Sequence, residues 1–148
     1  MSISPLANAL LCLNSLSDMV TMRVNGASSL RTAIEMIFED HLESLSIDSI
    51  EGTLYASISF QSGSMTVVYE KGEKLQLSNI EYDGGRCEQF ISIPVPEFLE
   101  NLEVLSESDW YSDGNNGKPL DDAGKNLLNE MRRLGRSPEF RGIPSTNA

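Results

Sequence analysis

The chain has 148 residues, of which 40% are hydrophobic, and this is enough for one domain with a single core. It carries 22 acidic and 11 basic residues, so its net charge is -11 and its pI is near 4.4. This charge argues against nucleic acid as a primary partner, because phosphates would be repelled, and it favours a basic macromolecule.

The cysteines and the apolar segments indicate where the protein works. Cys12 and Cys87 are far apart and match no disulfide framework, zinc site or redox motif. The apolar run at residues 6–13 lacks a positive leader and a convincing cleavage site. No segment approaches the roughly 18 apolar residues that span a bilayer. We therefore expect a cytoplasmic protein with no membrane partner.

Charge is distributed unevenly along the chain. The segment after Gly117 has a net charge of +2, whereas the first 117 residues have a net charge of -13. A basic C-terminal helix could therefore dock on the acidic body of the same chain or on a second copy, which makes a homodimer possible.

The first third of the chain reads as two helices separated by a short strand. Ser4 and Pro5 suit a helix start, and apolar residues then recur at helical spacing up to Leu16. Alternation at residues 20–24, closed by Asn25-Gly26, predicts a short strand. A second helix is predicted over residues 28–46, with an apolar stripe made of Leu30, Ile34, Ile37, His41 and Leu45.

The middle of the chain alternates with period two and predicts an antiparallel meander. Leu54 begins the first apolar alternation and Met65 the second, and a slip of phase at Ser78-Asn79 predicts a bulge in the third. The Asp83-Gly84-Gly85 turn precedes a fourth strand over residues 89–95, in which Pro94 requires an edge position. Short connections imply antiparallel neighbours.

The last third returns to helical spacing. Helices are predicted over residues 97–107 and 119–134, with a polar loop between them and a flexible tail over residues 137–148. The expected fold is therefore α+β, a single domain over residues 1–136. An antiparallel sheet of about four strands is packed on one face by the helices at residues 28–46, 97–107 and 119–134.

Two of the predicted helices carry rows of carboxylates. Same-sign neighbours on a helix destabilise it by roughly 0.2 to 0.5 kcal/mol per pair. Because the rows lack the alternating lysines of an ordinary surface helix, we interpret them as partner-binding surfaces, the alternative being a solvated helix face. The rows are Glu35, Glu39 and Glu43 on the first helix and Glu97, Glu100, Glu103 and Glu107 on the second.

Two adjacent aromatic residues, Trp110 and Tyr111, lie in the polar loop among Glu107, Asp109 and Asp113. A ring beside carboxylates suits a Lys or Arg of a partner, through cation-π and ion-pair contacts. The alternative is that Trp110 fills the core beneath the loop.

No catalytic or metal site is predicted. His41 is the only histidine, and no nucleophile has a recognisable elbow. A calcium loop at Asp109 to Leu120 fails, because Tyr111 and Leu120 occupy ligand positions. We expect no cofactor.

These observations favour a small, acidic, non-enzymatic protein that neutralises or escorts a basic protein partner, as an inhibitor of the immunity-protein type does. The alternatives are a secretion-type chaperone, a small enzyme or ligand-binding domain with a carboxylate-lined cleft involving His41 or Asp113, and a structural oligomeric subunit. The residues predicted to bind the partner are Glu35, Glu39, Glu43, Glu100, Glu103, Glu107, Asp109, Trp110, Tyr111 and Asp113.

Overall fold

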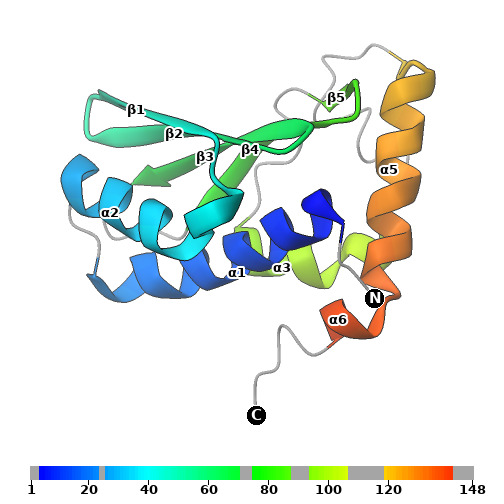
Figure 1. Cartoon of the computed structure of the whole chain (residues 1–148), viewed down its shortest axis with the longest axis horizontal. Coiled ribbons are helices and arrows are strands. Elements are labelled where there is room, and N and C mark those ends of the chain that lie inside the picture. The colour runs from blue at the N-terminus through cyan, green and yellow to red at the C-terminus, as the bar shows by residue number, and fades with distance from the viewer. Residues whose placement is uncertain (1–3, 24–25, 71–74, 88–93, 107–118, 142–148) are drawn as a thin grey trace.

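Two helices, a meander sheet and further helices follow one another along the chain (Figure 1). The α+β class is confirmed, and the described sheet has five strands where about four were expected. None of the described helices is long and apolar enough to cross a membrane. The computed structural model describes residues 4–23, 26–70, 75–87, 94–106 and 119–141.

The sheet is a simple antiparallel meander in the order β1-β2-β3-β4-β5. Tight turns at Glu51-Gly52 and Asp83-Gly84 join two of its hairpins, and all four residues have positive φ. Such turns match the twist of the strands that they join. The strands are β1 (Ser44–Ile50), β2 (Thr53–Phe60), β3 (Gly63–Glu70), β4 (Gln76–Tyr82) and β5 (Gly85–Cys87).

The helices that the structure describes cover one face of the sheet. Alternate residues of β2 and β3, from Leu54 to Tyr69, are at most 7% exposed and pack against α1 (Pro5–Arg23) and α2 (Ala27–Phe38). In Figure 1 these two helices lie along the same side of the sheet, and α5 (Asp122–Gly135) stands beside β5. None of the described helices lies over the opposite face of β1 to β3. That face carries the other half of the alternating pattern, as the sequence predicts.

The bulge predicted at Ser78-Asn79 is confirmed. Thr66 pairs with Asn79 and the next residue, Val67, pairs with Leu77, so Ser78 is the extra residue of β4. Because of this extra residue, Leu77 and Ile80 both face the core although they are three positions apart.

The strand predicted over residues 20–24 is wrong, because α1 continues to Arg23. A few alternating β-branched residues are a weak signal for a strand. The helix that carries the buried stripe from Leu6 to Leu16 continues to Arg23.

The helix predicted over residues 28–46 is too long. The α2 helix ends at Phe38, Glu39 has a φ of 44°, and a 3-10 turn, η1 (Glu39–His41), leads into β1. The predicted helical stripe includes Leu45, but this residue lies on β1, where it alternates with exposed Ser44 and Ser46. His41 is consequently exposed and does not lie on an apolar stripe.

The helix predicted over residues 97–107 is also broken. It consists of α3 (Val95–Glu100) and a 3-10 turn, η2 (Leu102–Val104), separated at Asn101. The side-chain Nδ2 of Asn101 donates to the carbonyl of Glu97 at 2.6 Å, which satisfies a carbonyl at the helix end. Of the strand predicted over residues 89–95, Pro94 forms an isolated bridge to Gln76 and residues 88–93 lie outside the described ranges.

The last helices pack on the body of the chain. Asp121 caps α5 by accepting from the backbone N–H of Gly124 at 2.8 Å, so this helix begins three residues later than predicted. Near its end, Arg132 Nε donates to the carbonyl of Leu105. Residues 138–141, expected to belong to the flexible tail, form α6 (Pro138–Arg141). Its Phe140 is only 5% exposed.

The packing of α5 on β5 depends on the absence of a side chain at Gly85. A Cβ there would meet the carbonyl oxygen of Ala123 and would lie 2.9 Å from Leu127 Cβ. We predict that Gly85→Ala lowers the free energy of unfolding by about 1 to 3 kcal/mol, because α5 must move away. Urea denaturation measures this, with exposed Asn126→Ala on α5 as a control that changes stability by less than about 0.5 kcal/mol. Equal stability of the Gly85 variant and the native protein would contradict the described packing.

Candidate functional site: the acidic edge of the sheet

One continuous stretch of the chain concentrates negative charge. Residues 32–70 contain seven carboxylates and neither lysine nor arginine. All seven side chains are exposed, so their charge reaches solvent and a partner alike. They are Glu35, Glu39, Asp40, Glu43, Asp48, Glu51 and Glu70.

The fold gathers most of these carboxylates around β1, the first strand of the sheet. Glu43 directly precedes β1, Asp48 lies within it, and Glu51 directly follows it in the turn to β2. Glu39 and Asp40 belong to the η1 turn that leads into the strand. We call these five residues the acidic edge. Their joint field attracts cations.

Exposed apolar side chains lie beside the acidic edge on the uncovered face. Tyr55 on β2 is directly opposite Asp48 on β1 and Val68 on β3, and it is 37% exposed. Ile50, at the end of β1, is 57% exposed. A partly exposed tyrosine next to carboxylates can contact both the stem and the charge of an arginine. This combination of an aromatic side chain and surrounding charge is typical of protein interfaces.

The structure divides the first predicted row of carboxylates and describes only part of the second. Glu35 remains on α2, 3.8 Å from Arg31, but Glu39 and Glu43 leave the helix because α2 ends at Phe38. Glu97 and Glu100 are exposed on α3, and Glu103 in η2 lies 4.0 Å from Arg136, which directly follows α5. The remaining predicted partner-binding residues, Glu107, Asp109, Trp110, Tyr111 and Asp113, lie outside the described ranges.

Sequence reasoning missed Asp48, Ile50, Glu51 and Tyr55 as members of one surface. The signal that could have found it is the lack of any lysine or arginine between residues 32 and 70. This lack of cations indicates one surface in space only when residues 44–50 are recognised as a strand that pairs with β2.

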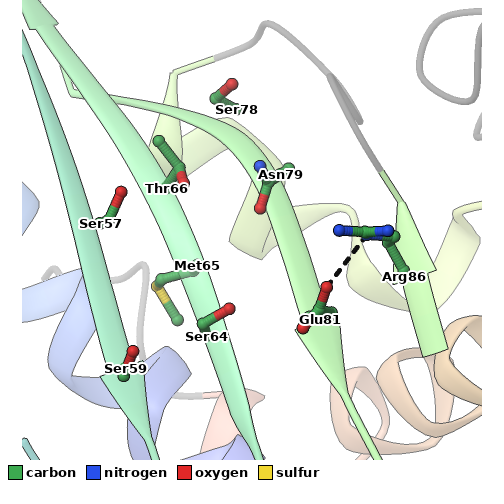
Figure 2. A pocket seen from close by; sticks show the side chains of 9 residues that line it. All are labelled: Ser57, Ser59, Ser64, Met65, Thr66, Ser78, Asn79, Glu81 and Arg86. Atoms are coloured by element: carbon green, nitrogen blue, oxygen red, sulfur yellow. Dashed lines mark ion pairs between the residues drawn. The ribbon is translucent and has the colours of Figure 1, made fainter. Parts of the chain in front are cut away.

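A second feature of the uncovered face is a shallow hollow of about 440 Å³ across β2 to β5 (Figure 2). Arg86 on β5 forms an ion pair with Glu81 on β4 at 3.0 Å, and both side chains line the hollow. The rest of the lining is mainly uncharged and polar, with Ser57, Ser59, Ser64, Thr66, Ser78 and Asn79. Among the described residues that line the hollow, Glu81 is the one carboxylate, and the others offer mainly hydroxyl and amide groups for hydrogen bonds.

Among the described residues, Cys12 is a thiol that could act as a nucleophile, but its surroundings do not activate it. The Sγ of Cys12 donates to the carbonyl of Ile37 at 3.6 Å. Burial, together with the nearby Glu39 carboxylate, raises the pKa of the Cys12 thiol. An activated cysteine would show the opposite shift. Within the described ranges, no group of three or more His, Cys, Asp and Glu side chains could hold a metal ion.

Comparison of the chain with protein-family models, with curated proteins and with solved structures gives no match.

The raised pKa of Cys12 predicts slow reaction with a thiol reagent. A higher pKa leaves less thiolate at a given pH, and half-burial hinders access. In a Cys87→Ser variant at pH 8, iodoacetamide should label Cys12 at least about tenfold more slowly in the native protein than in urea. Labelling that is faster in the folded protein would instead indicate an activated nucleophile.

The exposed apolar residues should contribute little to stability. We predict that Tyr55→Ser and Ile50→Ser each change the free energy of unfolding by less than about 1 kcal/mol. Leu54→Ala, the buried neighbour of Tyr55, should cost about 2 to 5 kcal/mol in the same urea titration. A loss at Tyr55 as large as that at Leu54 would show that Tyr55 serves the core and not a surface.

Proposed function

We propose that this protein is a non-enzymatic binding protein that neutralises or escorts a basic protein partner, which it holds at the acidic edge of the sheet. The observation that carries the proposal is the exposed set of Asp48, Glu51 and Tyr55, which combines charge with an aromatic side chain on an uncovered surface. Charge complementarity of this kind raises association rates and rejects acidic competitors.

The basic residues of the chain favour a foreign partner over a second copy. In the last turn of α5, Arg132 contacts the carbonyl of Leu105 and Arg133 pairs with Glu130, and Arg136 directly after the helix pairs with Glu103. These three cations therefore have partners within their own chain. A homodimer that joins α5 of one copy to the carboxylates of another would have to give up these contacts.

The contacts expected at the acidic edge define the kind of partner. The carboxylates are exposed and hydrated, so each ion pair at the rim is worth only about 0.2 to 1 kcal/mol. Affinity must then come from several such pairs acting together and from burial of Tyr55 and Ile50. A partner surface with arginines around an apolar contact satisfies both requirements, and its binding weakens as salt screens the charges.

Charge reversal at the acidic edge tests the proposal. The tagged protein is first used at low salt to capture its partner from a lysate of its own organism. The affinity of the recovered basic protein is then measured for Asp48→Lys combined with Glu51→Lys. We predict that this double variant weakens binding by at least about tenfold, because two attractive contacts become repulsive.

Glu97→Lys combined with Glu100→Lys is the matched comparison, because both residues belong to the second carboxylate row that the sequence predicts to bind the partner. It makes the same change of net charge at two exposed positions of α3, away from β1. We expect it to weaken binding only about twofold, through the long-range field. An equal loss in both double variants would contradict a site confined to the acidic edge. Failure to recover any basic protein at low salt would contradict the proposed function itself.

A further inference from the structure

The outer edge of β1 is free of backbone partners within the described residues. β1 ends the sheet and pairs along its whole length with β2 only, from Ser44 opposite Ser59 to Ile50 opposite Thr53. Every second N–H and C=O of such a strand points away from the sheet. An edge strand therefore presents a ready template for one further strand.

β1 lacks the devices that usually protect an edge. It has seven residues, its register with β2 is unbroken, and it contains neither proline nor lysine. Its one charged residue, Asp48, faces the same side as Tyr55. The carboxylates at its two ends repel acidic strands but attract basic ones. Charge thus determines which strands can pair with this edge, and no proline or irregularity within β1 prevents the pairing.

We propose that β1 accepts an extended basic segment of the partner as a sixth strand, through main-chain hydrogen bonds. This inference rests on the proposed function and specifies how the partner binds. Strand addition supplies affinity through the backbone, and the side chains of the added strand then determine its specificity.

The two faces of β1 define the sequence of that segment. On the uncovered face the added strand lies beside Ser46 and Asp48, where arginine or lysine is favoured. On the inner face it lies beside Leu45 and Ile47, which are half-buried and belong to the margin of the core. Residues that alternate between basic and apolar satisfy both faces, because successive side chains of a strand point to opposite sides.

A second copy of the chain fits this edge poorly. If β1 paired with itself in the fully overlapping antiparallel register, centred on Ile47, Glu43 of each copy would lie directly opposite Glu51 of the other. Like charges directly opposite destabilise a pair of strands. The charge pattern therefore favours a basic segment from a different protein as the occupant.

The test uses a synthetic peptide of about nine residues, a usual strand length, in which arginine and valine alternate. Binding is measured at low salt by calorimetry, and amide hydrogen exchange is followed across Ser44–Ile50. The control peptide has the same sequence with every backbone nitrogen methylated, so it keeps its charge but cannot donate. We expect the control to bind at least about tenfold more weakly. We also expect the parent peptide to slow exchange at alternate amides of β1 by at least about tenfold.

The outcomes separate this inference from the proposed function. In one outcome, both peptides bind equally well, exchange in β1 is not slowed, and the Asp48→Lys, Glu51→Lys protein loses binding. This outcome would overturn strand addition and leave the acidic binding surface intact. Slow, concentration-dependent exchange in β1 without peptide would assign the edge to a second copy and also overturn the inference. If neither peptide binds while the partner recovered from lysate does, strand addition fails alone. If no basic protein is recovered from the lysate either, the proposed function fails with it.

Discussion

The packing of one sheet face against α1 and α2 is the constraint on which the rest of this structure depends. Apolar side chains from β2, β3 and β4 and from the two helices form one buried cluster. Burial of apolar surface is worth roughly 25 cal/mol per Å², so this cluster dominates the favourable side of folding. Because the helices cover only that face, the polar half of each strand stays available on the other. The face of the sheet that the described helices leave uncovered is thus a consequence of one-sided packing.

The acidic edge also depends on how the chain uses its few cations. The three arginines near the end of α5 contact η2 or their own helix, and Arg86 pairs with Glu81 across β4 and β5. These contacts lie on the β4, β5 and α5 side of the molecule (Figure 1). The opposite side, from the end of α2 through β1, keeps its carboxylates without lysine or arginine in the same stretch. The elements that carry these four arginines therefore lie away from β1.

The sequence predicted the fold where local signals agreed with each other. The alternation in β2 and β3, the turn at Asp83-Gly84 and the slip at Ser78-Asn79 all correspond to described structure. It failed at β1, because Leu42 and Leu45 fit a helical stripe as well as a strand and no glycine or proline marks the end of α2. Glu39 ends that helix with a positive φ, which is uncommon for a residue other than glycine. This single boundary error displaced Glu43 and His41 and concealed the acidic edge.

The bulge in β4 has a consequence for the composition of the uncovered face. A regular strand turns successive residues to opposite sides, so either Ser78 or Asn79 would point into the core. A polar side chain buried without a hydrogen bond costs roughly 1 to 3 kcal/mol on the scale of protein mutations. With the extra residue, both Ser78 and Asn79 line the hollow, while Leu77 and Ile80 on either side of them stay buried. The chain can therefore place two consecutive polar residues in the middle of a strand without putting either in contact with the apolar core.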